Sequence, residues 1–331
     1  QKLLKESPSL QHKLISEPIV TNALTHGLSL AADLFAQSGD PIIYPDKNWE
    51  NYDLSFGLRR NVRHVSFSLY NEQRQFNHVG LKEAILAQKD HGKAIVILNF
   101  PNTPTGYTPS DEEADRIVDA IREGAEQGIN IVVITDDAYY GLFFEDSIRE
   151  SLFAKLSGLH ERILPVKVDG ATKEDYVWGF RVGFITFSAN HEETLQVLEQ
   201  KAIGMIRATI SSGPHPSQTF ILRAMQSPEY EQQKQDKYNI MKRRANLVKQ
   251  LLDSGKYDDA WTYYPFNSGY FMCLCLKSVS AEHLRVHLLN KYGIGTIALG
   301  ETDLRVAFSC IEEEDLEELF ETIYQGAKEL M

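Results

Sequence analysis

The sequence is poor in cysteine, has no long apolar stretch and carries no excess of basic residues. Its three cysteines, Cys273, Cys275 and Cys310, lack the number and spacing of a disulfide framework or a metal site, which favours a reducing compartment. No apolar run reaches the roughly 20 residues of a membrane-spanning helix. With 34 lysines and arginines against 46 acidic residues, the net charge of −12 argues against nucleic acid or an anionic membrane as a partner. We therefore expect a cytoplasmic protein that binds no metal, nucleic acid or membrane.

The chain does contain an alternation of short apolar runs with helix-length amphipathic stretches. Residues 94–98, 129–134 and 183–187 predict buried strands. The first two are rich in β-branched residues and do not alternate cleanly with polar ones, as expected of parallel strands covered on both faces. Strands separated by helix-length stretches predict an α/β domain whose mainly parallel sheet is flanked by helices.

Between the first two strands, residues 110–128 predict a helix. Ser110 as N-cap and Glu113 in the third helical position form the pattern of a capping box. The residues that face inward at helical spacing are Ala114, Ile117, Val118 and Ile121.

The last third of the chain has a different composition. Residues 218–254 are rich in glutamine, lysine and arginine and predict one long helix that leaves the first domain. An α+β unit is predicted beyond it, with strands at 261–264, 269–276 and 304–309 and helices at 281–292 and 312–330. We therefore expect a large domain over residues 1–225 and a smaller one over residues 226–331.

One lysine stands out for its chemistry. Lys173 lies within Asp169-Gly-Ala-Thr-Lys-Glu-Asp-Tyr-Val-Trp-Gly-Phe-Arg-Val-Gly183, and Arg181 follows it in a Gly-x-Arg-x-Gly turn. An amine can attack a carbonyl, and a fixed cation can hold an anion. The pair therefore suits a cofactor with both an aldehyde and a phosphate, and pyridoxal phosphate is such a cofactor.

The segment Thr135-Asp-Asp-Ala-Tyr-Tyr-Gly141 directly follows the second predicted strand. Open α/β sheets bind ligands at the carboxyl ends of their strands. A carboxylate there, for which we favour Asp136, can pair with a protonated pyridine nitrogen, and Tyr139 can hydrogen-bond a ring hydroxyl. The alternative interpretation is a strand-end turn whose acids are solvated.

Three further segments have a functional and a structural interpretation each. Asn99-Phe-Pro-Asn-Thr-Pro-Thr-Gly106 follows the first predicted strand and is either a rigid ligand-binding turn or an ordinary loop. A helix that begins near Asn22 to Thr25 offers first-turn amides and the Thr25 hydroxyl to a phosphate, or is simply a capped helix. Trp49 can stack on a flat heterocycle or belong to the core.

In combination, these segments resemble the class I/II aminotransferases, the aspartate aminotransferase family of fold-type I enzymes. The resemblance runs from about residue 17 to the C-terminus. It implies pyridoxal phosphate as cofactor, and an amino acid and a 2-oxo acid as substrates. Leu304-Arg-Val-Ala-Phe-Ser309 matches the family's arginine for the substrate carboxylate.

The resemblance implies a role for each matching residue. Lys173 would form the Schiff base with the cofactor and later act as the general acid and base. The other roles would be phosphate binding for Arg181, Thr25, the backbone at Leu24 and Thr172; ring stacking for Trp49; contact with the ring nitrogen for Asp136 and with the ring hydroxyl for Tyr139; and binding of the α-carboxylate for Arg305.

The chain departs from the family pattern in three places. Thr103 replaces the asparagine before Pro-Thr-Gly, which leaves Thr103, Asn99 and Asn102 as alternatives for contact with the ring hydroxyl. Gly170 replaces a serine that commonly helps to hold the phosphate. Most of the family's N-terminal arm, which carries substrate-covering residues, is also missing before the Thr25 segment.

The function that we expect is transfer of an amino group between an amino acid and a 2-oxo acid, an EC 2.6.1 activity. One alternative is a lyase or decarboxylase that uses the same cofactor, and another is a non-catalytic aminotransferase-like sensor domain. Residues 207–214 match a stretch that reaches the neighbouring active site in the family, so a homodimer with shared sites is implied. A loop between helices is the simpler interpretation of that stretch.

Overall fold

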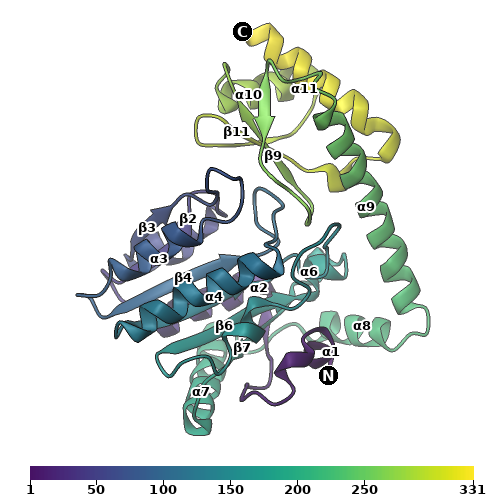
Figure 1. Ribbon diagram of the computed structural model, residues 1–331. Helices are drawn as coiled ribbons and strands as arrows, with labels where there is room; N and C mark the ends of the chain where they lie inside the picture. The colour runs from purple at the N-terminus through teal and green to yellow at the C-terminus, as the bar shows by residue number, and fades with distance from the viewer. The chain divides into compact units, whose positions relative to one another are not determined.

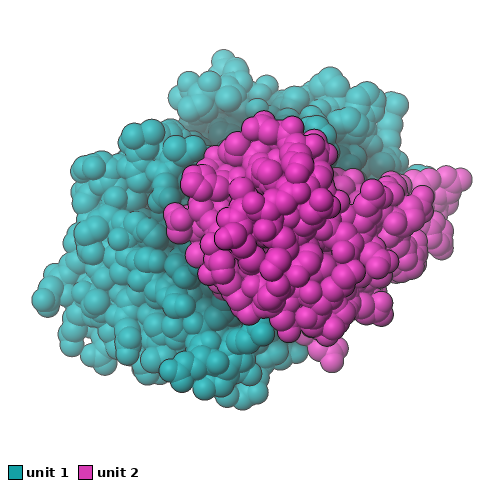
Figure 2. Space-filling model, turned by 90° about the horizontal axis from the view of Figure 1, so that it is seen from above, with its two compact units in different colours: residues 1–101, 109–141, 147–227 teal, residues 102–108, 142–146, 228–331 magenta.

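The computed structural model describes residues 1–331 and divides into two compact units (Figures 1 and 2). Unit 1 comprises residues 1–101, 109–141 and 147–227, and unit 2 comprises residues 102–108, 142–146 and 228–331. None of the helices is both long and apolar enough to cross a membrane.

Unit 1 is built on a seven-stranded sheet in the order β1-β7-β6-β5-β4-β2-β3. Its strands are β1 (Ile19–Asn22), β2 (Pro41–Pro45), β3 (Arg63–Phe67), β4 (Lys93–Asn99), β5 (Asn130–Asp136), β6 (Ile163–Gly170) and β7 (Val182–Phe187). Strand β7 runs antiparallel to its neighbours β1 and β6, whereas every other neighbouring pair is parallel. The mainly parallel sheet predicted from the sequence is thereby confirmed.

Helices cover both faces of this sheet (Figure 1). The helices of unit 1 are α1 (Lys2–Glu6), α2 (Ala23–Phe35), α3 (His78–Leu86), α4 (Asp111–Glu126), α5 (Leu152–Leu156), α6 (Ala171–Glu174), α7 (Glu192–Thr209) and α8 (His215–Met225). The predicted capping box of α4 is confirmed, because the Ser110 hydroxyl accepts from the backbone of Glu113 while the Glu113 carboxylate accepts from the backbone of Ser110.

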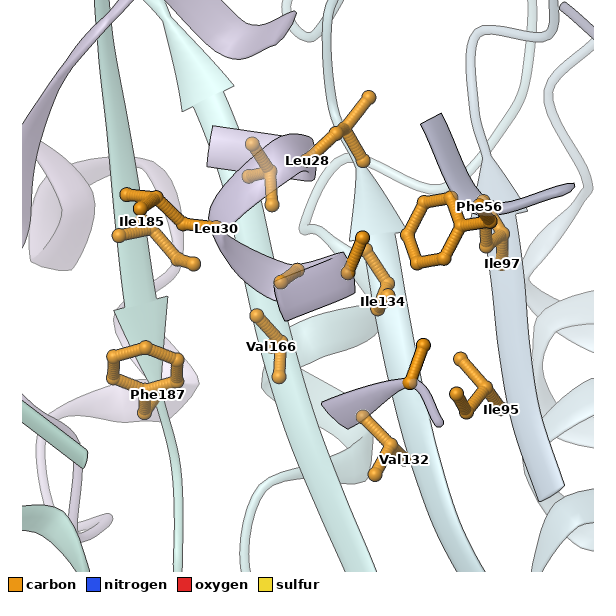
Figure 3. Packing of buried hydrophobic residues seen from close by; sticks show 14 of the residues in the cluster. Leu28, Leu30, Phe56, Ile95, Ile97, Val132, Ile134, Val166, Ile185 and Phe187 are labelled. Atoms are coloured by element: carbon orange, nitrogen blue, oxygen red, sulfur yellow. The ribbon is translucent and has the colours of Figure 1, made fainter. Parts of the chain in front are cut away.

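One apolar cluster joins the sheet to α2. Alternate residues of the central strands point to the same face, and Figure 3 shows them meeting Leu28, Leu30 and Phe56. The sheet residues labelled there are Ile95, Ile97, Val132, Ile134, Val166, Ile185 and Phe187. The residues between them point to the other face, toward α4. Ile131, for example, lies close to Gly124 of α4. Burial on both faces explains why these strands are apolar almost throughout.

Unit 2 contains a four-stranded antiparallel sheet in the order β10-β11-β9-β8. Its strands are β8 (Trp261–Tyr263), β9 (Met272–Leu276), β10 (Ile297–Leu299) and β11 (Asp303–Val306), and its helices are α9 (Tyr230–Asp253), α10 (Ala281–Tyr292) and α11 (Leu316–Leu330). Helix α10 has the predicted bounds.

Two short earlier segments belong to unit 2 and bond to its later part. The backbone N–H of Phe144 donates to the carbonyl of Asn267 at 2.9 Å, and the Ser268 hydroxyl donates to the carbonyl of Gly106 at 2.9 Å. The Tyr238 hydroxyl of α9 donates to the carbonyl of Phe143 at 2.6 Å. These bonds anchor residues 102–108 and 142–146 within unit 2.

Some predicted elements are wrong in extent. The single helix expected over residues 218–254 is two helices, because α8 ends at Met225 and α9 begins at Tyr230. Pro228 lies in the break, where it has no N–H to donate and restricts the preceding residue. The strand expected over 304–309 ends at Val306, and a 3₁₀ turn follows at Phe308–Cys310.

A glycine substitution tests how tightly β7 meets the start of α2. A Cβ on Gly183 would lie 2.5 Å from the carbonyl carbon of Ala23 and 2.7 Å from the nitrogen of Leu24, and neither backbone atom can move aside easily. We expect Gly183→Ala to lower the free energy of unfolding by about 2 kcal/mol or more, measured by urea denaturation.

The matched control is Gly204→Ala in α7, where a Cβ meets nothing within 4 Å. There we expect stabilisation of about 0.5–1 kcal/mol from the better helix former. Equal effects of the two substitutions would contradict the close approach of β7 and α2.

Candidate functional site

The predicted site segments of unit 1 begin at the ends of three adjacent strands. Asn99, Asp136 and Gly170 are the last residues of β4, β5 and β6, respectively. Asn99 and Asp136 are aligned in the parallel register, and the Asn99 side-chain amide donates to the backbone carbonyl of Asp136 at 2.9 Å. The carboxyl edge of the sheet therefore collects polar groups from segments far apart in the chain.

Asp136 is a buried carboxylate that forms no ion pair with a basic side chain. It is 1% exposed and accepts hydrogen bonds from the Tyr52 hydroxyl at 2.6 Å and from the backbone N–H of Ala138 at 3.2 Å. Burial raises the pKa of Asp136 to about 6, although these two hydrogen bonds act in the opposite direction. The arrangement is suited to receive a cation from a ligand.

Lys173 lies close to the segment that follows Asp136. It is half-buried in α6, directly after β6, and its Nζ lies 5.8 Å from the centre of the Tyr139 ring. Tyr139 and Thr172 are both buried. The structure thus brings the predicted lysine and the predicted hydroxyl-binding tyrosine together.

Arg181 and the start of α2 meet in a strained piece of backbone. Ala23 and Arg181 both have left-handed φ angles, 62° and 54°, and the N–H of Ala23 donates to the carbonyl of Arg181 at 2.9 Å. Such conformations in residues with a Cβ concentrate at functional sites. Leu24 is buried and Thr25 is exposed in the first turn of α2, where free amides favour an anion.

Gly170 has a steric reason to lack a side chain. A Cβ there would lie 2.6 Å from the carbonyl oxygen of Val182 and 2.9 Å from the Cα of Gly183. The serine common at this place in the family would therefore collide with β7.

Trp49 connects to the same buried network through its ring edge. It is half-buried, and its ring lies 5.8 Å from that of Tyr52 at an angle of 84°. Since Tyr52 donates to Asp136, the two aromatic residues and the carboxylate form one continuous chain of contacts.

Two predicted site residues belong to unit 2. Thr103 is buried within segment 102–108, where the Asn102 side-chain oxygen accepts from the Thr105 hydroxyl at 2.7 Å. Arg305 lies in β11 with its guanidinium carbon 4.2 Å from the centre of the Phe271 ring, a cation–π contact that orients the guanidinium.

The sequence matches the family described as "Aminotransferase class I and II" over residues 1–323. The chain belongs to this family. Its curated relatives include an aspartate aminotransferase of Pyrococcus horikoshii, 22% identical over 329 residues, a match that covers 95% of this chain and 77% of the relative. Another aspartate aminotransferase, from Musicola paradisiaca, is 24% identical over 195 residues, which cover 59% of this chain but 46% of the relative.

Solved structures agree with this assignment. An aminotransferase from Anaerococcus prevotii superposes with a TM-score of 0.86 at 25% identity, covering 99% of this chain and 79% of the other. The kynurenine aminotransferase of Pyrococcus horikoshii, solved in complex with PMP, superposes with a TM-score of 0.80 at 16% identity, covering 99% and 78%. The expected fold-type I architecture, with its second smaller sheet, is confirmed.

Sequence reasoning missed three contributors to the site. Tyr52 carries no motif of its own and is identified only by its bond to Asp136. The Ala138 amide and the left-handed Ala23 act through the backbone, which side-chain patterns do not reveal.

The buried carboxylate of Asp136 should weaken the cofactor-free protein. Its pKa of about 6 lies above the usual 3.9 of an unfolded chain, so the folded state binds the proton more tightly. Below about pH 4 there is no penalty, and as the pH rises through about 6 the folded state loses stability. We expect Asp136→Asn to be more stable than the wild type at pH 7.5, by up to about 3 kcal/mol, and similar at pH 4.

Urea unfolding of the cofactor-free proteins at the two pH values measures this difference. Asp90→Asn, which changes an exposed acid, is the matched control and should not alter the pH dependence. Parallel curves for wild type and Asp136→Asn would show that the carboxylate carries no penalty in the folded state.

Proposed function

We propose that this chain is a pyridoxal-phosphate-dependent aminotransferase that moves an amino group between an amino acid and a 2-oxo acid. The observation that carries the proposal is the buried Asp136 carboxylate, which forms no ion pair with a basic side chain. Tyr139, three residues after Asp136, lies close to Lys173. Pyridoxal phosphate is the cofactor of this family, and its pyridine nitrogen needs such a carboxylate to stay protonated. The local residues therefore fit this cofactor.

Each residue of the site has a proposed task toward the cofactor. Lys173 would bond its aldehyde and Asp136 its ring nitrogen. The other tasks are phosphate binding by Arg181, Thr25, Thr172 and the amide of Leu24, stacking by Trp49, and hydrogen bonding to the ring hydroxyl by Tyr139 with Asn99 or Thr103. The left-handed backbone at Ala23 and Arg181 supports the phosphate assignment, because it fixes the first turn of α2 against β7.

When bound, pyridoxal phosphate supplies an electrophilic aldehyde and a ring that withdraws electrons from the substrate's Cα. The protein's part is to hold charge and to move a proton. Asp136, which is buried and accepts a hydrogen bond from Tyr52, would stabilise the positive charge at the ring nitrogen. The unprotonated amine of Lys173 would take the proton from Cα and return it on the cofactor side as general acid.

Removal of the Lys173 amine tests this assignment. We expect Lys173→Ala to retain non-covalent cofactor binding but to lose the absorbance of the lysine–cofactor bond and at least about 10³-fold in 2-oxo-acid-dependent amino transfer, because both nucleophile and base are lost. The measurement combines absorbance spectra with borohydride reduction and peptide mass analysis. The matched control is Lys201→Ala, which removes an exposed lysine in α7. A reduced cofactor adduct at full occupancy in Lys173→Ala would refute the role of Lys173.

In unit 2, we propose that Arg305 binds the substrate's α-carboxylate. The contact with Phe271 fixes the position of the Arg305 guanidinium, a group whose fork of N–H donors matches the two oxygens of a carboxylate. This assignment fixes the substrate class as amino acids without fixing the side chain.

Substitution of Arg305 separates substrate binding from cofactor binding. We expect Arg305→Gln to raise KM for the amino acid by about 30- to 100-fold, corresponding to roughly 2–3 kcal/mol for a lost charged contact, while the cofactor spectrum stays unchanged. Arg285→Gln removes a surface arginine paired with Glu282 and is the control. An unchanged KM would exclude Arg305 as the carboxylate ligand.

We also propose that the chain forms a homodimer and that residues 1–225 act as the cofactor domain and 226–331 as the small domain. Exposed apolar side chains on unit 1 support a second copy as partner: Trp178, Ile203, Phe220 and Leu222 are each at least 55% exposed. Sedimentation equilibrium tests the homodimer: one chain has a mass of 37.6 kDa, and a homodimer would have twice that mass. The division into two domains near residue 225 is supported by the last stretch of unit 2, which begins directly after Ser227.

A cytoplasmic location is the last part of the proposal. The support is chemical: Cys273, Cys275 and Cys310 all remain free thiols, as expected in a reducing compartment. Cell fractionation that recovers the protein in a membrane or extracellular fraction would contradict this location.

A further inference from the structure

Strand β6 carries a lysine in the interior of the protein. Lys167 is 2% exposed, whereas its neighbours Val166 and Val168 belong to the apolar cluster on the α2 face. Because side chains alternate along a strand, Lys167 points to the opposite face of the sheet. A buried ammonium is stable only when it is paired, so its partners define what it does.

Two carboxylates bind this ammonium. The Nζ of Lys167 lies 2.7 Å from an oxygen of Asp137 and 2.8 Å from an oxygen of Asp169, and 5.3 Å from the centre of the Tyr140 ring. Asp137 directly follows Asp136, and Asp169 lies at the end of β6 just before the helix that carries Lys173. One side chain therefore joins the two segments that hold the proposed nitrogen partner and the proposed Schiff-base lysine.

Two members of this ion cluster act on Asp136: the charge of Asp137 raises its pKa, and the charge of Lys167 lowers it. The cluster of Lys167, Asp137 and Asp169 has a formal charge of −1, the sum of one positive and two negative groups. Without the ammonium it would be −2, next to a carboxylate that is already desolvated. A nearby negative charge favours the protonated form of a carboxylate, so loss of the ammonium would raise the pKa of Asp136, the group that must stay ionised.

The other titratable groups around the cluster are few. Tyr52 faces Asp136 from the segment after β2, and Tyr140 faces Lys167. Glu6 of α1 adjoins Tyr140, whose hydroxyl donates to the Glu6 backbone carbonyl at 3.0 Å. No second basic side chain pairs with Asp137 or Asp169, which leaves Lys167 as the compensating cation.

We propose that Lys167 is a positioning residue of the cofactor site, whose ammonium keeps Asp136 ionised so that Asp136 can bind the protonated ring nitrogen. This inference rests on the proposed function, because the proposed cofactor supplies the ring nitrogen that Asp136 would bind. Lys167 itself touches neither cofactor nor substrate in this assignment and acts through Asp137 and Asp169.

The test measures binding of pyridoxal phosphate to the full-length, cofactor-free protein between pH 6 and pH 9, by absorbance titration. Lys167→Met gives the cluster a charge of −2, and Lys167→Met/Asp169→Asn restores −1 without restoring the lysine. For Lys167→Met, we expect the dissociation constant relative to wild type to be about fivefold larger at pH 6 than at pH 9, the result of a one-unit rise in the pKa of Asp136. The double variant should lose most of this pH dependence.

A third variant keeps the inference testable if Lys167→Met does not fold. Asp169→Asn alone makes the cluster neutral, and this side chain is 21% exposed. We expect this variant to bind pyridoxal phosphate more tightly than wild type at pH 6. The difference from wild type should be smaller at pH 9. An unchanged pH profile in Asp169→Asn would overturn the inference, as would equal, pH-independent weakening in Lys167→Met and the double variant. A wild-type protein that binds no pyridoxal phosphate would instead overturn the proposed function, and this inference with it.

Discussion

The desolvated carboxylate of Asp136 is the constraint on which the site depends. A buried anion without a basic partner is unfavourable unless the surrounding structure holds it in place. Here β5 lies between β4 and β6, the Tyr52 hydroxyl and the Ala138 amide donate to the carboxylate, and the Asn99 amide fixes the backbone. In the folded protein Asp136 is 1% exposed, so its carboxylate has almost no contact with water. The favourable free energy of packing the core must therefore offset the cost of burying this carboxylate.

The parts of the fold that the sequence predicted are those with a strong local signal. Strands β4 and β5 are runs of β-branched residues, and α4 has both a capping box and a regular apolar stripe. The missed strands lack such a signal. Strand β3 is an exposed edge with one buried residue, β2 is bounded by prolines at both ends, and β6 is interrupted by Lys167 and Asp169. The break between α8 and α9 does have a signal in the sequence, because Pro228 has no N–H to donate and restricts the residue before it.

The residues of the candidate site also divide into those that the sequence indicates and those that only the folded chain reveals. Asn99 and Asp136 could be placed at the carboxyl edge of the sheet because they follow the predicted strands 94–98 and 129–134 in the sequence, and α/β proteins bind ligands there. Lys173 could not be placed in this way, because β6 was not predicted. Tyr52 could not, because only the folded chain brings it to Asp136. The left-handed angles at Ala23 and Arg181 also escape a reading of side chains, since both residue types usually adopt other conformations. Lys167 resembles an interruption of a strand until its two carboxylate partners are known.

The chain passes into unit 2 twice before it enters it for good, at residues 102–108 and 142–146. On the ribosome these two segments emerge long before β9 and the loop that they bond, so their hydrogen bonds to Asn267 and Ser268 wait until synthesis is nearly complete. The C-terminal third, cut free after Ser227, would lack both segments and with them part of its own interior. Unit 2 is therefore compact in space but is not a segment of sequence that can be inherited, exchanged or expressed by itself.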